Sequence, residues 1–295
     1  MDLEQLETQG FIVIDSGLDS AQLHSDFIAT LATFVAFKPD ATSYVGGGFS
    51  ALGNSRSFHN AFVRNIRNQL HEKLVTPLKT LGASRGTPKL ELLVDRMLYR
   101  PLGTTMAGES WHRDEAPGQP NDLVLGGWIN CGKVVEQFIC VPASQLDTHE
   151  GKGFHKLKRE DFPNYKQHEH IVRIHPGQAL LFNETLIHRV APSKGVHVLY
   201  RLFLGWRLTN SSEPLNPATR SELERQVIVT LKSGQTPRMF PKLWPVNHKH
   251  LLPRFSEQIV DMYLDENKLC PVFLNEAPYN ELPYSPQELD LYKPH

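Results

Sequence analysis

The clearest fold signal is GQALLFNETLIHRVAPSKGVHVLYRLFLGWRL, residues 177–208, because it indicates three consecutive β-strands. A turn at Pro176-Gly177 leads into a short apolar strand at Ala179–Phe182. A second strand is expected at His188–Ala191, and a longer one, rich in branched and aromatic residues, at Val196–Leu208. Short strands that follow one another through turns are typical of a sandwich or a barrel.

A histidine and an aspartate stand two residues apart in WHRDE, residues 111–115. If this segment is extended, alternation puts His112 and Asp114 on one face, where both can bind one ion. His188 would then arrive from a neighbouring strand. Two histidines and one carboxylate occupy one face of an octahedral Fe(II) and leave positions open for a co-substrate and dioxygen. A His-x-Asp pair alone is more often a surface ion pair or a buried structural histidine, so the metal hypothesis depends on the surrounding sequence.

Arg201 follows His188 on the last of the three strands. An arginine in an apolar strand is costly to bury unless a carboxylate matches its charge. A guanidinium can hold a carboxylate through two parallel hydrogen bonds, which suits the distal carboxylate of 2-oxoglutarate. The alternatives are that Arg201 pairs with a structural Asp or Glu, or that it faces solvent. Arg207, on the same face of the strand, is a second candidate for the same role.

Five segments appear in an order that resembles the phytanoyl-CoA dioxygenase-like family of Fe(II)/2-oxoglutarate oxygenases. The resemblance covers about residues 8–208. It rests on an opening strand and helix, a strand that leads to the His-x-Asp motif, a core strand, a strand that ends in a Pro-x-Ser turn, and the segment with the second histidine. In chain order these are QGFIVIDSGLDSAQLHSDF, MLYRPLGTTMAGESWHRDE, LGGWIN, EQFICVPASQ and PGQALLFNETLIHR.

The resemblance implies a mainly β protein with flanking helices and a double-stranded β-helix core, a cupin-like jelly roll at about residues 90–208. Its metal would be Fe(II), held by His112, Asp114 and His188. Its co-substrate would be 2-oxoglutarate, anchored by Arg201. The expected reaction uses dioxygen, hydroxylates a small-molecule substrate, and releases succinate and carbon dioxide. Retention of Asp114 favours hydroxylation, because related halogenases lack this carboxylate.

Three further residues would surround the co-substrate by the same resemblance. Trp128 would border it, Asn130 would share the face of Trp128, and Tyr99 would offer a hydroxyl group. Each also has a structural interpretation, because aromatic residues in strands usually pack in the core or against the sheet.

The chain departs from the family pattern in several places. The usual Pro-Gly-Ser turn is Pro142-Ala143-Ser144, and the histidine that usually follows it is Gln145. The residue two after the second histidine, often a small hydroxyl residue, is Val190. The interval from His188 to Arg201 is longer than usual.

Composition limits the class of protein. Of the 295 residues, 40% are hydrophobic and 21% charged, which fits a globular protein. The formal net charge of −1 argues against a main role in nucleic-acid binding, although residues 152–159 are locally basic. No apolar stretch is long enough to cross a bilayer, and the opening MDLEQLETQG is too polar for a signal peptide. The three cysteines have no metal-binding spacing, so a reducing, cytoplasmic location is the simplest interpretation.

The sequence predicts one oxygenase domain at residues 1–208 and a helical, proline-rich extension at 209–295 packed on it. A strand at Phe11–Ile14 and helices at Ser20–Phe37 and His59–Leu81 would precede the barrel. The glycine-rich segment 38–57, with Gly46–Gly48, is either a lid or an ordinary connection. Helices are expected in the extension at Glu213–Leu231 and Phe255–Leu264. The extension could cap the barrel, form a dimer contact or only pack, and the oligomeric state stays open.

The sequence is also compatible with two other classes of protein. A cupin-like metal enzyme that does not use 2-oxoglutarate would keep the barrel and the ligands. A non-catalytic jelly-roll protein would need no convergence of ligands. The pairs His168/His170 and His248/His250 also compete for a metal, but neither has a third ligand in a strand, and we interpret them as solvated loop residues.

Overall fold

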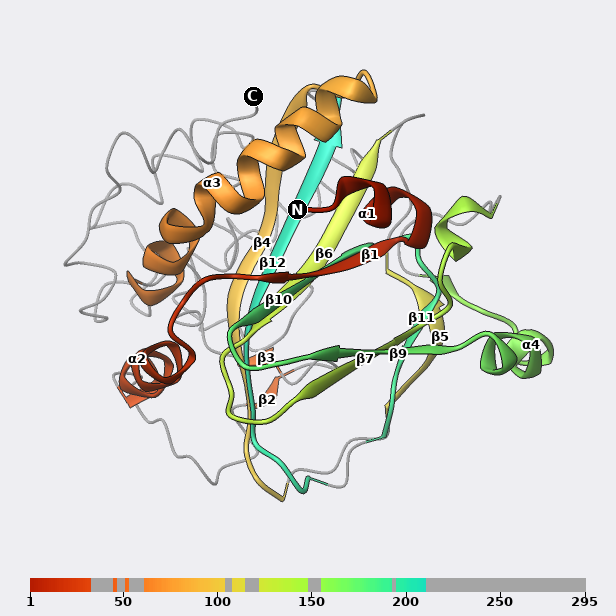
Figure 1. Cartoon of the computed structure of the whole chain (residues 1–295). Coiled ribbons are helices and arrows are strands. Elements are labelled where there is room, and N and C mark those ends of the chain that lie inside the picture. Colours follow the sequence, from red (N-terminus) through yellow and green to blue (C-terminus); the bar gives the residue numbers. More distant parts are fainter. Residues whose placement is uncertain are drawn as a thin grey trace, which may run out of the picture.

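Two antiparallel sheets form the body of the computed structural model (Figure 1). The larger sheet has the order β1-β10-β6-β12-β4-β3-β2 and the smaller one β8-β5-β11-β7-β9. The structure describes residues 1–32, 45–46, 51–52, 61–103, 108–114, 122–147, 155–192 and 195–210. The strands are β1 (Phe11–Asp15), β2 (Val45–Gly46), β3 (Ala51–Leu52), β4 (Lys89–Arg100), β5 (Glu109–Arg113), β6 (Leu123–Asn130), β7 (Glu136–Cys140), β8 (His155–Lys156), β9 (His170–Ile174), β10 (Gln178–Asn183), β11 (His188–Val190) and β12 (Leu199–Thr209).

The chain passes repeatedly between the two sheets, which is the mark of a jelly roll. β4 lies in the larger sheet and β5 in the smaller; β6 returns to the larger; β7 and β9 lie in the smaller; then β10, β11 and β12 alternate. The mainly β, double-stranded β-helix fold predicted from the sequence is therefore confirmed. The three strands expected within residues 177–208 are β10, β11 and β12.

Helices cover the outer face of the larger sheet. They are α1 (Leu3–Gln9), α2 (Ser20–Ala32) and α3 (Ala61–Ser84), and α3 runs along β4 and β12 (Figure 1). Phe27 of α2 and Leu70 of α3 are almost fully buried in one apolar cluster with alternate residues of β12, Leu202 and Leu204. Because side chains alternate along a strand, the two neighbours of Leu202, Arg201 and Phe203, face the space between the sheets.

The space between the sheets holds a second apolar cluster. Its aromatic members are Trp128 of β6, Phe138 of β7 and Phe182 of β10, all buried. The ring centroids of Phe138 and Phe182 lie 4.7 Å apart, and both rings also contact Trp128. This aromatic packing fixes the distance between the sheets at the place where the functional residues gather.

Several sequence expectations fall partly or wholly outside the described residues. The helix expected at Ser20–Phe37 is described to Ala32, and the one expected at His59–Leu81 is described as α3, from Ala61 to Ser84. Apart from residues 45–46 and 51–52, the glycine-rich segment 38–57 lies outside them, as does the extension after residue 210 with both of its expected helices. None of the helices in the described ranges has the length and apolar character needed to cross a membrane.

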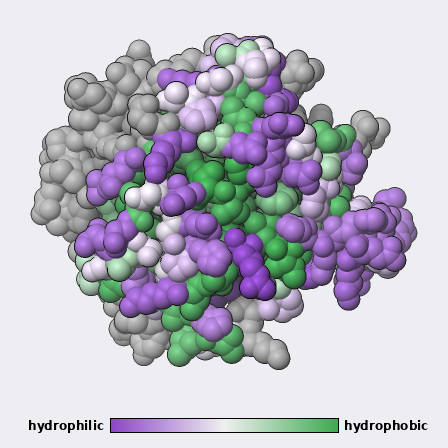
Figure 2. Space-filling model, in the orientation of Figure 1, coloured by the Kyte–Doolittle hydropathy of each residue, from purple (hydrophilic) through white to green (hydrophobic). Residues whose placement is uncertain are grey.

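A polar lobe projects from the smaller sheet. Figure 2 shows it as a strongly hydrophilic bulge over α4 (Phe162–Gln167) and the preceding 3-10 turn η4 (Arg159–Asp161). Lys158 pairs with Glu160 at 3.6 Å, and both side chains are largely exposed. Since basic and acidic residues are mixed here, the described part of the basic stretch noted in the sequence is not a uniformly positive surface.

Candidate metal centre

His112, Asp114 and His188 meet between the sheets. His112 on β5 and His188 on β11 are paired directly across the two strands, and their ring centroids lie 4.3 Å apart. Nε2 of His112 lies 3.3 Å from Oδ1 of Asp114, and Nε2 of His188 lies 3.3 Å from Oδ2 of the same carboxylate. Neighbouring ligands of one octahedral ion are about 3 Å apart. The three side chains therefore fit a single metal ion.

The backbone orients both imidazole rings. Nδ1 of His112 lies 2.6 Å from the carbonyl oxygen of Ser110, and Nδ1 of His188 lies 2.9 Å from that of Leu186. A ring nitrogen that donates to a carbonyl leaves the other nitrogen, Nε2, with its lone pair directed at the shared point. The amide of Asp114 donates to the carbonyl of Glu184 at 2.9 Å, which ties the residue after β5 to the loop before His188.

The charges at this cluster depend on one another. Burial by itself would raise the pKa of Asp114, but His188 and His112 lower it below its ordinary range. Burial lowers the pKa of His112, but the hydrogen bond and charge of Asp114 outweigh burial and raise it. Asp114 is thus held as an anion between two imidazoles, which is the protonation state a divalent metal needs from a carboxylate ligand.

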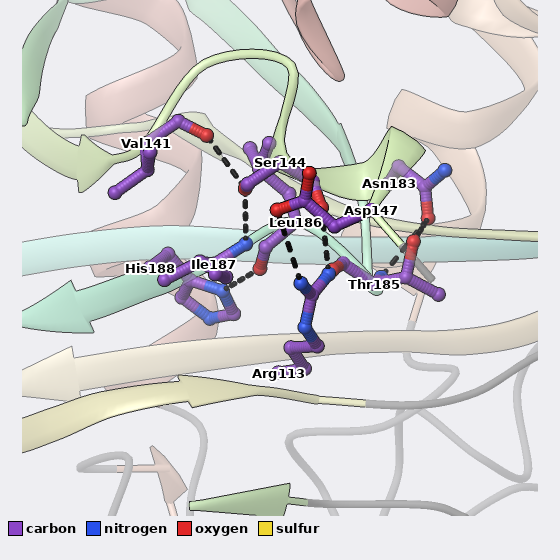
Figure 3. Close-up of polar contacts among 9 residues, drawn as sticks. All are labelled: Arg113, Val141, Ser144, Asp147, Asn183, Thr185, Leu186, Ile187 and His188. Atoms are coloured by element: carbon purple, nitrogen blue, oxygen red, sulfur yellow. Dashed lines mark hydrogen bonds and ion pairs between the residues drawn. The ribbon is translucent and has the colours of Figure 1, made fainter. Parts of the chain in front are cut away.

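A hydrogen-bond network supports the chain that leads to His188 (Figure 3). Ser144, in the Pro142-Ala143-Ser144 turn, accepts a hydrogen bond from the amide of Ile187 at 2.9 Å and donates to the carbonyl of Val141 at 2.6 Å. Arg113 donates to the carbonyls of Ser144, at 2.9 Å, and Thr185. The turn that resembles the family's Pro-Gly-Ser motif therefore positions the second histidine.

Replacing Ser144 by Ala is expected to weaken metal binding by about tenfold. The substitution leaves the amide of Ile187, next to His188, without its acceptor and loosens the ring. Isothermal titration with Mn(II) measures the change. Ser84, whose hydroxyl donates to Leu81 at the end of α3, provides the control, because Ser84→Ala removes a similar bond far from the cluster. Equal Mn(II) affinities of the two variants would contradict the positioning role of Ser144.

Glu109 reaches the edge of the cluster, which the sequence did not predict. Oε2 of Glu109 lies 3.7 Å from Nε2 of His112. The pairing of β11 with β5 shifts between His188 and Val190, so that Val190 faces Glu109. Glu109 is three residues from His112, so regular alternation would place the two side chains on opposite faces. The bulge brings Glu109 onto the face of His112. Burial raises the pKa of Glu109, and the charge of His112 lowers it in part.

Arg201 lies between the sheets on the face of Trp128, with its guanidinium carbon 4.2 Å from the centre of the indole ring. Its Nε donates a hydrogen bond to the carboxylate of Glu136, the first residue of β7. Of the interpretations considered for Arg201, pairing with an internal carboxylate is the one the geometry shows. Trp128 links this pair to the metal cluster, since its neighbours Phe138 and Phe182 both contact the ring of His188.

Asn130 shares the face of Trp128 as expected, but its side chain is bonded to the backbone, and Tyr99 lies on the other face of the sheet. The amide group of Asn130 donates to the carbonyls of Val134 and Ile174, at 2.8 and 2.9 Å, and its oxygen accepts from the amide of Gly132. Both amide protons are thus used by the backbone, and none is left for a co-substrate. Tyr99 packs against Tyr200 in the cluster beneath the helices, on the opposite face of the larger sheet from Arg201. We therefore leave both residues out of the site.

The other candidates from the sequence lie away from the cluster. Arg207, the second candidate for the anchor, is buried near Asp122, whose charge partly offsets the lowering of its pKa by burial. The ring of His170 stacks on Phe11. Within the described part of the chain, no group other than His112, Asp114 and His188 has the spacing of a metal site. His248 and His250 lie outside the described residues.

No family model matches the sequence, and no curated protein matches it either. Several solved structures resemble the fold at low sequence identity. EctD from S. alaskensis, solved with 2-oxoglutarate and 5-hydroxyectoine, has a TM-score of 0.50 and 14% identity, covering 69% of this chain and 73% of EctD. The epimerase SnoN in complex with Fe3+, alpha ketoglutarate and nogalamycin RO has a TM-score of 0.49 and 15% identity, covering 73% of this chain and 86% of SnoN. HygX from Streptomyces hygroscopicus with nickel and 2-oxoglutarate bound has a TM-score of 0.48 and 16% identity, covering 69% of this chain and 85% of HygX. The likeness to EctD supports the jelly-roll fold.

Proposed function

We propose that this chain is an Fe(II)- and 2-oxoglutarate-dependent dioxygenase that hydroxylates a small molecule and releases succinate and carbon dioxide. The observation that carries the proposal is the convergence of His112, Asp114 and His188 inside a jelly roll. Within this reaction class, the order of the sequence motifs favours the phytanoyl-CoA dioxygenase-like group.

Each proposed site residue has a task that follows from its environment. His112, Asp114 and His188 would hold the metal, and the anionic carboxylate of Asp114 offsets part of its charge. Arg201, whose guanidinium lies over the ring of Trp128 and is bonded to Glu136, is the cation that would meet the distal carboxylate of the co-substrate. The aromatic cluster of Trp128, Phe138 and Phe182 excludes water from the interior. When bound, Fe(II) and 2-oxoglutarate supply the dioxygen chemistry that oxidises a C–H bond.

We further propose that residues 1–208 form the catalytic domain, with residues 209–295 as an extension packed on it, and that the protein acts in the cytoplasm. The two described cysteines support a reducing location, because Cys131 and Cys140 are free and buried. Burial raises the pKa of the Cys140 thiol to about 12, so neither disulfide exchange nor metal binding is expected of it.

The test is a stepwise titration of the full-length protein. Anaerobic calorimetry with Mn(II), a redox-silent substitute for Fe(II), measures metal binding first. Addition of 2-oxoglutarate to the Mn(II)-loaded protein then measures co-substrate binding, and succinate release in air with Fe(II) measures turnover. Metal binding without 2-oxoglutarate binding or succinate would favour a cupin-like enzyme of another type. Absence of metal binding would favour a non-catalytic jelly-roll protein.

A further inference from the structure

The proposed anchor for the distal carboxylate of 2-oxoglutarate already contacts a carboxylate of the chain itself. Arg201 donates to Glu136 through Nε, and the side chain of Glu136 is only 2% exposed. The two residues come from different sheets, β12 and β7, and meet in the interior. An external carboxylate that approaches Arg201 must therefore share the guanidinium with Glu136 or displace it.

A second arginine belongs to this group. Arg100, at the end of β4, is buried and stands on the same face as Leu98, the residue paired with Arg201. Burial and, to a smaller extent, the charge of Arg201 lower the pKa of Arg100 to about 10, although the charge of Glu136 partly opposes them. Two guanidinium groups and one carboxylate give the group a formal charge of +1. Without Glu136 the same place would carry two positive charges.

Because Glu136 is buried, its negative charge acts strongly on neighbouring charges. Burial raises the pKa of Glu136, and the charge of Arg201 lowers it in part. In an interior with few polar groups, charges interact much more strongly than in water. A second carboxylate placed on Arg201 would lie beside Glu136 and be repelled by it, whereas an uncharged chain end would not.

Resting on the proposed function, we propose that Glu136 sets the choice of 2-oxo acid, by competing with a distal carboxylate for Arg201. The site then has little preference for 2-oxoglutarate over a 2-oxo acid of equal length that ends in a methyl group. Such discrimination by an opposing charge is a general way to lower the affinity for one ligand relative to another.

The experiment compares two ligands in calorimetric titrations of the Mn(II)-loaded, full-length protein. The ligands are 2-oxoglutarate and 2-oxopentanoate, which share the chelating end and the chain length but differ in the distal carboxylate. For the wild type we expect dissociation constants within about threefold of each other. In Glu136→Gln, which keeps a hydrogen-bond acceptor for Arg201 but removes the charge, 2-oxoglutarate should bind at least tenfold more tightly, or about 1.4 kcal/mol. The affinity for 2-oxopentanoate should stay within twofold.

Glu169 provides a matched control. It forms an ion pair with Arg189 at 2.9 Å and is partly buried like its partner, but neither residue belongs to the group around Arg201. Glu169→Gln should change neither dissociation constant. Thermal unfolding of each variant shows whether it is folded.

Three outcomes would overturn the inference. If 2-oxoglutarate binds Glu136→Gln no better than the wild type, Glu136 only holds Arg201 in place. If the wild type binds 2-oxoglutarate at least tenfold more tightly than 2-oxopentanoate, Arg201 binds the distal carboxylate in spite of Glu136. This comparison uses the wild type alone, so it tests the inference even if Glu136→Gln does not fold. If neither acid binds any folded, Mn(II)-loaded protein, the proposed function fails and the inference with it.

Discussion

Replacing Asp114 by Ala is expected to abolish metal binding and all turnover that depends on it. Both carboxylate oxygens are used, one 3.3 Å from Nε2 of His112 and the other 3.3 Å from Nε2 of His188. Without them the site has two neutral nitrogen ligands and no negative charge to offset the ion. We expect the affinity for Mn(II) to fall by at least about 100-fold, since even groups that only support ligands contribute 10- to 100-fold. Anaerobic calorimetry measures the loss, and succinate release measures the turnover.

The control for this variant is Asp26→Ala. Asp26 is a partly exposed residue of α2, away from the cluster, whose carboxylate accepts a hydrogen bond from Gln22, so its loss should leave the Mn(II) affinity unchanged. Succinate release by Asp114→Ala at the rate of the wild type would contradict the assignment of the ligand.

The same carboxylate gives the metal-free protein a defined pH dependence. Because the pKa of Asp114 is lower in the folded chain than its ordinary value, the ionised form stabilises the fold at neutral pH. This contribution is lost as the pH falls below the ordinary range of an aspartate, about 4. Below that range, the difference in unfolding temperature between the wild type and Asp114→Ala should become smaller.

The fold and the three proposed ligands could be predicted because their signals are local. His112 and Asp114 are two residues apart, and strand alternation alone puts them on one face. The predicted strands of residues 177–208 correspond to β10, β11 and β12, and the face of Arg201 follows from the same alternation. The sequence analysis also expected His188 on a neighbouring strand, and β11 pairs with β5.

The partners of these residues could not be predicted, because they depend on contacts distant in sequence. Glu136 is 65 residues from Arg201, and nothing in EQFIC shows that its first side chain turns inward to a guanidinium. Tyr99 was expected near the co-substrate, but the register of β4 pairs it with Tyr200 and leaves Leu98 opposite Arg201. One residue of register separates the two faces of a sheet, and the sequence of a long, largely apolar strand does not fix it. Glu109 needed a bulge that no sequence pattern revealed.

Arg113 has a role in the stability of the fold that the sequence also did not reveal. In WHRDE it looks like a charged residue between two metal ligands, yet its side chain is 4% exposed. Burial lowers the pKa of this guanidinium, and Asp147, with a closest approach of 3.8 Å, raises it in part. Its hydrogen bonds go to the backbone carbonyls of Ser144, in the turn after β7, and Thr185, in the loop between β10 and β11 (Figure 3). The buried guanidinium of Arg113 therefore connects the Pro-Ala-Ser turn to the loop that precedes His188.

Arg113→Met is therefore expected to destabilise the fold by about 3 kcal/mol. Methionine fills a similar volume but removes the donor to the buried carbonyl oxygen of Thr185 and leaves that of Ser144 with only the amide of Asp147, at 3.3 Å. Each lost bond to a buried carbonyl costs about 1–3 kcal/mol. For a chain of this size the midpoint of thermal unfolding should fall by about 6–12 °C. Arg189→Met is the matched control, because Arg189 pairs with Glu169 and lies over the ring of Trp111 while keeping a quarter of its side chain exposed. It should lower the midpoint by less than half as much. Equal midpoints for the two variants would mean that the carbonyls find other donors, and that the loops before β11 do not depend on Arg113 for their position.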